Sequence, residues 1–320
     1  MVRVNRNKTC NPRWGLIAGL GIVAMLALVG TPLASFAAEA KQEMFSTPEE
    51  AVDALIAASR SGNQPELLKI LGPRGGKLIS SGDPVADKEG RDKFLTAYDT
   101  AHKLVGDSDD KKELVVGDKE WPLPVPLVRH GGKWRFDTAV GEQEILDRRV
   151  GRNELNVIEV CREYVAAQEE YADQYRLKNG KPEYAQRFLS HEGKRDGLYW
   201  PIKENEKESP FGPLIATAEA EGYDKKAGNI KHEPYHGYYY KILAAQSKNA
   251  SGGAVNYISD GHMTGGFALL AFPAKYGDSG IMTFIVNQNG IIREKDLGAN
   301  TAKIAPGIKL YDPDESWRLP

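Results

Sequence analysis

The stretch from Gly141 to Arg176, GEQEILDRRVGRNELNVIEVCREYVAAQEEYADQYR, constrains the fold most because its pattern predicts one long helical region. From Asn153 onward its apolar and polar positions fall on separate faces, which is typical of a helix that packs on a core. Gly141 and Gly151 are expected to interrupt the helix, since glycine disfavours helix interiors. We therefore expect a helical connector over residues 141–152 and a regular helix from Asn153.

The segments before this region predict helices first and strands afterwards. Thr47, Pro48 and Glu50 indicate the start of a first helix, because they supply a cap, a proline at the first helical position and a capping box. A second helix is expected in PELLKIL and a third in DKEGRDKFLTAYDTAHKLV, with His102 at the edge of its apolar stripe. Short strands in KELVVG, WPLPVPLVRH and KWRFDTA complete an α+β domain over residues 45–140.

The segments after the long helix are mostly strands, in HGYYYKIL, GGFALLAFPAKYG, GIMTFIVN and GIIREKDLG. The Asn289-Gly290 pair between the last two predicts a hairpin in which both residues adopt positive backbone dihedrals. Phe284, Val286 and Ile292 are expected to alternate into the core beneath the long helix that carries Cys161. Together with that helix, these strands predict a second α+β domain over residues 153–320.

A Gly/Ser-rich segment, SKNASGGAVNYISDGHMTGG, interrupts these strands and is expected to be an exposed loop. Its glycines do not follow a strand and open a helix, so they are assigned to turns and not to a phosphate-binding loop. Exposed loops often carry function, and this one is a possible interaction surface. Its candidate residues are Ser251, Gly252, Gly253, His262 and Gly265.

The first 37 residues have the organisation of a secretory signal peptide. Four basic residues precede an apolar run from Gly15 to Gly30, and ASFAAEA supplies small residues for signal peptidase. Cleavage after Ala37 predicts a periplasmic or secreted protein, and the alternative is that the apolar run stays as a membrane anchor. Cys10 would be removed with the signal.

The charge of the expected mature chain argues against a nucleic-acid partner. The chain has 42 basic and 44 acidic residues, and four of the basic ones lie in the signal. The mature chain therefore has about 38 basic against 44 acidic residues, a net charge of about −6. Binding to a phosphate backbone requires a basic surface, which this composition does not indicate.

Cys161 is the single cysteine of the expected mature chain, so no intramolecular disulfide is predicted. It shares a helical face with Ile158 and Val165, which indicates a buried side chain. A buried thiol of this kind is expected to be inert and not a catalytic nucleophile.

The residues His232-Glu233-Pro234-Tyr235-His236 spell the H-E-x-x-H signature of zinc metalloproteases. That site needs both histidines on one face of a helix, with the glutamate activating a metal-bound water. Pro234 disrupts such a helix, and the tyrosines that follow favour a strand. Two hypotheses result: a zinc site formed by His232, Glu233 and His236, and the preferred one, the start of a strand.

A second catalytic motif, Gly277-Asp278-Ser279-Gly280, resembles the nucleophile turn of chymotrypsin-like proteases. That chemistry needs a histidine base, an orienting acid and an oxyanion hole. The nearest upstream histidine is His262, in the Gly/Ser-rich segment, and the preceding segments are mostly helical, unlike the double β-barrel of those proteases. A tight turn between two strands is the preferred interpretation, and a nucleophilic Ser279 is the alternative.

Two parts of the chain resemble known folds. TPEEAVDALIAASRSGNQPELLKILGP and GGKWRFDTAVG are similar to the nuclear-transport-factor-2-like (SnoaL-like) cone fold, which implies helices packed into a curved sheet. VCREYVAAQEEYADQY, HGYYYKIL and FALLAFPAKYGDSGIMTFIVNQNGIIREKDLG resemble the globular part of type IV pilin-like proteins, which implies a helix packed on an antiparallel sheet. The residues on the pilin-like pattern are Ala167, Gln168, Tyr171, Gly237, Tyr238, Ala271, Pro273, Gly277, Gly280, Phe284, Asn287, Gly290 and Ile292. The order of all segments resembles the secreted family catalogued as domain of unknown function 2950.

These observations predict a non-catalytic exported protein of the bacterial envelope that acts as a binding or assembly module. Its partner would be an envelope protein or a small ligand, with no nucleic acid, no cofactor and no metal. Membrane contact is expected only through the signal segment. The mature chain is expected to be a monomer or small oligomer, because it has no second apolar segment of the kind that polymerises pilins. The alternative is a secreted hydrolase that uses His232, Glu233 and His236 or Ser279.

Overall fold

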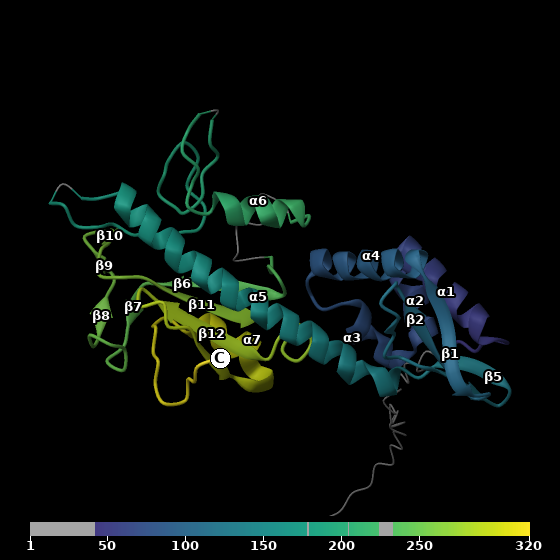
Figure 1. The fold of residues 1–320 in the computed structure, drawn as a ribbon. Coiled ribbons are helices and arrows are strands. Elements are labelled where there is room, and N and C mark those ends of the chain that lie inside the picture. The colour runs from purple at the N-terminus through teal and green to yellow at the C-terminus, as the bar shows by residue number, and fades with distance from the viewer. Residues whose placement is uncertain (1–41, 178, 204, 224–232) are drawn as a thin grey trace, which may run out of the picture. The chain divides into compact units, whose positions relative to one another are not determined.

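The computed structural model describes residues 42–320 except 178, 204 and 224–232, so the expected signal segment lies outside the described residues. Helices and antiparallel sheets make an α+β fold, as predicted (Figure 1). The helices are α1 (Pro48–Ser61), α2 (Gln64–Leu71), α3 (Gly76–Ile79), α4 (Pro84–Thr100), α5 (Thr138–Gln174), α6 (Gly212–Ala220) and α7 (Thr301–Ile304), with 3-10 turns at Pro73–Gly75, Gly298–Asn300 and Ala305–Gly307. The strands are β1 (His102–Ser108), β2 (Lys111–Val116), β3 (Trp121–Pro122), β4 (Leu127–His130), β5 (Lys133–Phe136), β6 (Tyr238–Leu243), β7 (Ala245–Gln246), β8 (Val255–Asn256), β9 (Ile258–Ser259), β10 (His262–Met263), β11 (Ala268–Pro273), β12 (Met282–Asn287) and β13 (Arg293–Asp296).

The first helix forms where its sequence signals lie. The Thr47 hydroxyl accepts a hydrogen bond from the Glu50 N–H at 3.1 Å, and Gly62 ends α1 in a left-handed conformation. α1, α2 and α4 pack on an antiparallel sheet in which β1, β2, β4 and β5 are successive neighbours and β3 pairs with β2. Buried apolar side chains between these helices and the sheet form the first core, from Phe45 to Phe136.

The third predicted helix is shorter than its pattern indicated. α4 ends at Thr100, and the chain from His102 forms β1. The prediction that His102 lies on the helix was therefore wrong, although its ring stacks on Tyr98 with the ring centroids 3.8 Å apart. Pairing with β2 explains the difference, because the ladder that begins at His102 and Val116 satisfies the backbone groups that a further helical turn would use.

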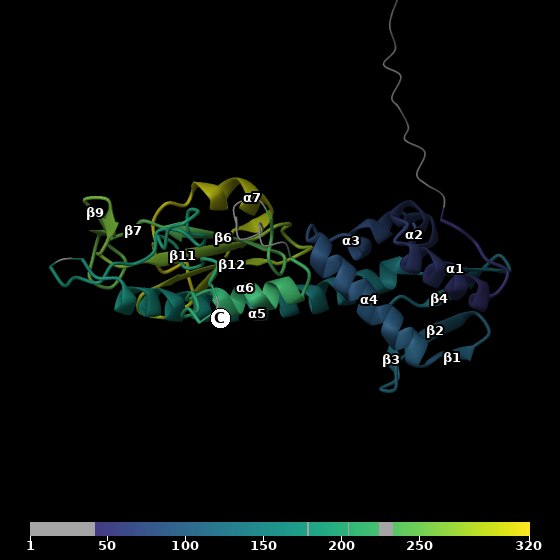
Figure 2. The ribbon, with the colours of Figure 1, turned by 90° about the horizontal axis from the view of Figure 1, so that it is seen from above.

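α5 is one continuous helix of 37 residues, so the predicted breaks at Gly141 and Gly151 do not occur. Its first part packs on α3, and its second part, from Val157 to Tyr171, belongs to the second core. Figure 2 shows α5 running along the C-terminal strands. Burial of both parts of the helix outweighs the roughly 1 kcal/mol that an interior glycine costs relative to alanine.

The described residues from 42 onward belong to one compact unit that contains two hydrophobic cores. The domain boundaries predicted at residues 45–140 and 153–320 stay a prediction, since α5 continues through the expected connector without a break. No helix in the described part of the chain is both long and apolar enough to cross a membrane.

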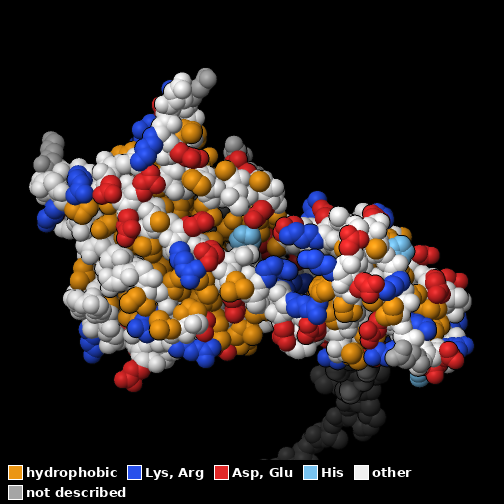
Figure 3. Space-filling model, viewed as in Figure 1, with side chains coloured by type: hydrophobic (Ala, Val, Ile, Leu, Met, Phe, Trp, Pro, Cys, Tyr) orange, Lys and Arg blue, Asp and Glu red, His pale blue; other side chains and the backbone are white. Residues whose placement is uncertain are grey.

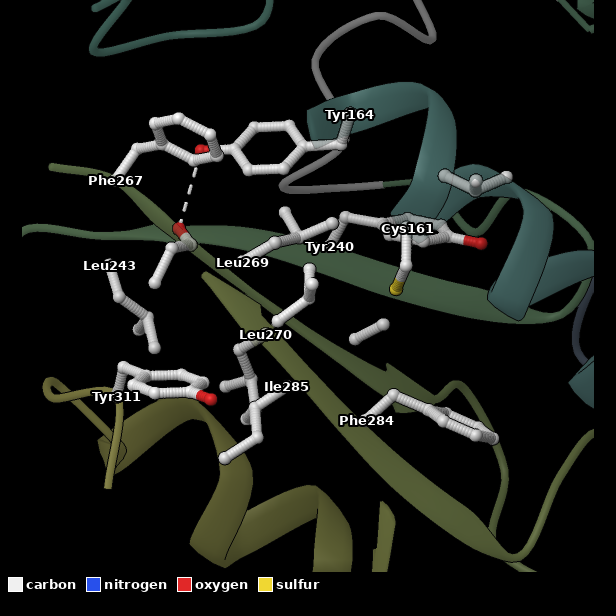
Figure 4. Close-up of a cluster of buried hydrophobic side chains, with 14 of the residues drawn as sticks. Cys161, Tyr164, Tyr240, Leu243, Phe267, Leu269, Leu270, Phe284, Ile285 and Tyr311 are labelled. Atoms are coloured by element: carbon white, nitrogen blue, oxygen red, sulfur yellow. Dashed lines mark hydrogen bonds between the residues drawn. The ribbon is translucent and has the colours of Figure 1, made fainter. Parts of the chain in front are cut away.

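The second core surrounds a four-stranded antiparallel sheet in the order β13-β12-β11-β6. Tyr164 of α5 covers one face, and its hydroxyl donates to the Ala268 carbonyl at 3.3 Å (Figure 4). Tyr311 of the C-terminal segment lies against the other face (Figure 4). Because both faces are covered, successive residues of β12 such as Phe284 and Ile285 are equally buried. The predicted burial of Phe284 is confirmed, but the strand does not alternate between buried and exposed positions.

β12 and β13 form the predicted hairpin around Asn289 and Gly290, but its turn is wider than two residues. The last paired residues are Ile285 and Arg293, and Gly290 has a φ of 70°. The prediction that Asn289 also adopts a positive φ was wrong. Its N–H is bonded to the Asn287 side chain at 3.1 Å, so an Asx turn takes the place of a two-residue turn.

Candidate ligand-binding cavity

The N-terminal part of the described chain contains a cavity of about 280 Å³ among its helices. α1 to α5 and the chain from β3 to Val125 contribute to its walls. On α4 the contributing residues Ala86, Gly90 and Phe94 are spaced by four, and α5 contributes Ile145 and the arginines that follow it. Residues three or four apart lie on one face of a helix, so the lining side chains of each helix lie on a single face.

The walls of the cavity are mainly apolar. Leu55, Leu67 and Val125 are buried in the first core. Five further large side chains pack against the same core but are only half-buried, namely Leu78, Ile79, Phe94, Leu123 and Ile145. Covering apolar surface of this kind is favourable by about 25 cal/mol per Å². A ligand with an apolar body would therefore be stabilised here.

Arginines supply most of the polar groups of the cavity. Arg91 of α4 and Arg148, Arg149 and Arg152 of α5 line it. Asp87 is the one carboxylate among its described lining residues. Figure 3 shows Lys and Arg side chains gathered around a hollow between α4 and α5. Four guanidinium groups against one carboxylate make the local potential positive, although the chain as a whole carries a net charge of −2.

Arg149 is held in place by the protein itself. Its guanidinium donates to the carbonyls of Lys77 and Leu78, both at 2.7 Å, and so ties α5 to α3. Burial lowers the pKa of Arg149, while the neighbouring carboxylates of Asp87 and Asp278 raise it. An arginine starts from so high a pKa that the side chain stays charged at neutral pH.

Arg148 is also held, because it donates to the Glu144 carboxylate at 2.6 Å and lies over the Trp121 ring, 4.7 Å from the ring centroid. Arg91 and Arg152 differ from it, since neither forms a hydrogen bond or an ion pair with any residue that the structure describes. Two guanidinium groups whose donors no described residue uses therefore line the cavity.

The carboxylate of Asp87 is hydrogen-bonded to the backbone of Ser81. Both of its carboxylate oxygens accept the Ser81 N–H, at 3.0 Å. Burial raises the pKa of Asp87, and the hydrogen bonds from Ser81 and the charge of Arg149 oppose that shift. The described lining residues include no histidine and no cysteine.

The residues that match a known protein family include both cores and the cavity. The family model described as "Protein of unknown function (DUF2950)" matches residues 42–319. The chain belongs to this family. The resemblance predicted from the order of segments is thereby confirmed for the DUF2950 family. No curated protein and no solved structure matches the chain.

In this DUF2950 protein, the described part of the H-E-x-x-H motif is not helical. Glu233 lies in a bend, and His236 lies in a turn with a φ of 50° directly before β6, whereas His232 lies outside the described residues. The His236 Nε2 is 3.4 Å from the Glu221 carboxylate, and burial lowers the pKa of His236. Within the described residues, no group of three or more His, Cys, Asp or Glu side chains is placed to hold a metal ion.

Ser279 is buried in a tight turn. Its hydroxyl accepts the Lys275 N–H at 2.9 Å and donates to the Lys275 carbonyl at 3.1 Å, while its own carbonyl accepts the Asn153 side chain at 2.8 Å. His262 lies in a different hairpin, where its Nδ1 is 2.6 Å from the Glu183 carboxylate. The structure therefore gives the Ser279 hydroxyl two backbone partners and does not pair it with His262.

The predicted interaction loop is divided between two small hairpins. Residues 251–253 lie in the turn between β7 and β8, whereas His262 belongs to β10 and Gly265 follows it. The expectation that the whole segment is an exposed loop was wrong, because Tyr257 and Met263 are buried in the second core. The candidate residues themselves are exposed or half-buried.

Sequence reasoning missed the cavity. The signal for its cationic part was DRRVGR, in which Arg148, Arg149 and Arg152 recur at helical spacings of three and four. No comparable signal existed for its apolar walls, because they come from six segments that meet only in the folded chain.

Two further hollows are lined by described residues. One of about 670 Å³ lies beside α4 and includes Gly222, and one of about 370 Å³ lies between α5 and α6 and includes Tyr235. Because these residues lie close in sequence to 224–232, which are outside the described residues, no site is proposed at either hollow.

Proposed function

We propose that this DUF2950 protein is an exported, non-catalytic binding module whose ligand site is the cavity between α4 and α5. The observation that carries the proposal is the ring of half-buried apolar side chains, Leu78, Ile79, Phe94, Leu123 and Ile145. The cavity volume of about 280 Å³ is near the lower end of the range of about 300 to 1,000 Å³ typical of small-molecule sites. Such sites combine apolar walls with a few placed polar groups, which here are the arginines.

The remaining parts of the proposal concern location and fold type. The basic segment and apolar run at the N-terminus support export to the periplasm or the medium. Helices packed on an antiparallel sheet support a cone-like N-terminal part, and α5 packed on β11 and β12 supports a pilin-like C-terminal part. Enzymes of the cone superfamily place acids and histidines inside the cone, whereas the described lining of this cavity has one acid, Asp87, and no histidine.

A direct test compares two glycines at which an added Cβ meets no atom within 4 Å, Gly90 in the cavity wall and Gly151 outside it. The probe is a neutral, environment-sensitive fluorescent dye of naphthalene size. We expect wild type and Gly151→Leu to bind the dye with equal affinity. Gly90→Leu should bind it at least about tenfold more weakly, because the leucine side chain would occupy part of the cavity. Thermal melting of all three proteins controls for folding. If none of the three binds the dye, or if all bind it equally, the cavity is not the ligand site.

The hydrolase alternative is tested on the same preparations. A hydrolase that uses Ser279 requires Ser279→Ala to abolish turnover of an ester or peptide while the melting temperature stays near that of wild type. Under the binding proposal, a broad esterase and peptidase panel shows no turnover that this variant removes. Loss of such an activity in Ser279→Ala would replace the binding proposal with the hydrolase one.

A further inference from the structure

We infer that the cavity takes a single-chain amphiphilic anion, with an alkyl chain against its apolar walls and a carboxylate, sulfate or phosphate group at Arg91 and Arg152. This inference rests on the proposed function, because it names the class of ligand for the same site.

The size and lining of the cavity define the apolar part of the ligand. The cavity volume of about 280 Å³ is near the lower end of the range of small-molecule sites, so it has room for one alkyl chain and not for two. The half-buried side chains Phe94, Leu123 and Ile145 come from three different segments and present apolar surface to that volume. A single linear alkyl chain of medium length suits both the volume and the lining.

The arginines define the charged part. Arg91 and Arg152 have donors that no described residue uses, and a guanidinium group matches the geometry of carboxylate and phosphate oxygens. Arg149 is committed to backbone carbonyls but still contributes its charge. Asp87 opposes one of these charges, and its oxygens are turned to the Ser81 N–H. The excess positive charge therefore favours a ligand with one or two negative charges.

Other ligand classes fit less well. A neutral apolar molecule would gain nothing from the guanidinium groups of Arg91 and Arg152, because it carries no oxygen or charge for them to bind. A cationic amphiphile would meet like charges at the mouth. A small anion without a chain would leave the apolar walls exposed to water, and a bilayer lipid with two long chains exceeds the volume.

The test measures calorimetric affinities of purified full-length mature protein for decanoate, decanol, decyltrimethylammonium and acetate, with dioleoylphosphatidylglycerol vesicles as a bilayer arm. We expect decanoate to bind at least about tenfold more tightly than decanol, as expected for hydrogen bonds to a charged group, and acetate and the ammonium compound to show no binding. Affinity should rise about fourfold per added carbon from hexanoate and level off once further carbons no longer fit in the cavity.

Variants locate the charged group. Arg152→Gln and Arg91→Gln should each lower the affinity for decanoate by about tenfold and leave that for decanol unchanged. Arg162→Gln is the matched control, because Arg162 is an exposed arginine of α5 that is paired with Glu159 and lies outside the cavity. All variants are compared with wild type by circular dichroism and thermal melting, so that a misfolded variant is not scored as a binding defect.

The outcomes separate this inference from the proposed function. Three results would overturn the anionic-amphiphile inference: decanol binds as tightly as decanoate, the ammonium compound binds more tightly, or acetate binds as tightly as decanoate. In each case, binding of the dye would still support the cavity as the ligand site. Preference for vesicles over free decanoate would overturn the single-chain part. Absence of binding by every compound, including the neutral dye, would instead refute the proposed function.

Discussion

Gly141 and Gly151 both lie in α5, but replacing each by alanine should change stability in opposite directions. Gly151→Ala should stabilise the protein, and Gly141→Ala should destabilise it. At Gly151 an added Cβ meets no atom within 4 Å, and the residue is exposed. Alanine favours a helix interior over glycine by about 0.8–1.0 kcal/mol, so Gly151→Ala should raise the free energy of unfolding by about 0.5–1 kcal/mol.

At Gly141 the same Cβ would lie 2.4 Å from the Pro124 carbonyl oxygen and 2.7 Å from the Val125 nitrogen. These are backbone atoms that cannot rotate away, so the chain between β3 and β4 must shift. Overpacking of this kind costs typically about 1–3 kcal/mol and exceeds the helix-propensity gain of about 1 kcal/mol. Gly141→Ala should therefore lower the free energy of unfolding by up to about 2 kcal/mol. It should also weaken dye binding, since Val125 is part of the cavity wall.

Urea denaturation followed by circular dichroism measures both differences against wild type. Thermal melting gives a second reading, in which 1 kcal/mol corresponds to roughly 2–4 °C for a protein of about this size. A Gly141→Ala protein at least as stable as wild type would show that the β3–β4 segment does not pack on α5. Destabilisation by Gly151→Ala would show that α5 is not a continuous helix at that position.

Three further predictions concern buried polar groups. Asp83 is buried and accepts hydrogen bonds from the Tyr223 hydroxyl and the Gly237 N–H, both at 2.8 Å. Asp83→Asn should therefore lower the free energy of unfolding, measured in urea, by about 2–4 kcal/mol. A loss below about 0.5 kcal/mol would contradict this prediction. The pKa of His236 is lowered from 6.5 by burial, so its contribution to stability is present above pH 6.5 and is lost as the pH falls through the lower folded-state pKa. Over this range the free energy of unfolding should fall with decreasing pH by at most about 1.4 kcal/mol per pH unit. His236→Asn should lack this contribution, and asparagine tolerates the positive φ of that position. An unchanged pH dependence in the variant would show that other groups cause it. Burial raises the pKa of Cys161 to about 12, so a thiol reagent at neutral pH should label it only at the rate of unfolding, and rapid labelling of the folded protein would refute its burial.

Local signals in the sequence were sufficient where a few neighbouring residues decide the outcome. Thr47 and Gly62 determine the two ends of α1, because the cap and the left-handed residue satisfy backbone groups within one turn. The strands of the C-terminal sheet follow the β-branched and aromatic segments for a similar local reason. The order of segments also predicted a resemblance to the DUF2950 family, and the family model matches residues 42–319.

Competition between distant segments decided the rest. Whether His102 extends a helix or starts a strand depends on β2, which offers its backbone as a partner. Whether Gly141 and Gly151 break α5 depends on how much surface the helix buries along its whole length, which neither glycine encodes. The alternation expected for β12 fails at Ile285, which is buried like Phe284 because α5 and the C-terminal segment cover opposite faces of the sheet.

The sequence by itself determined the caps, turns and apolar periodicities of this protein, because these depend on residues within a few positions of one another. Only the tertiary structure decided that Arg152, Phe94 and Leu55 line one cavity, and that Asp83 hydrogen-bonds with Tyr223. The physical reason is that a cavity or a buried hydrogen bond is a property of several segments in contact. The free energy that brings such segments together comes from burying their combined surface, and no single segment contains it.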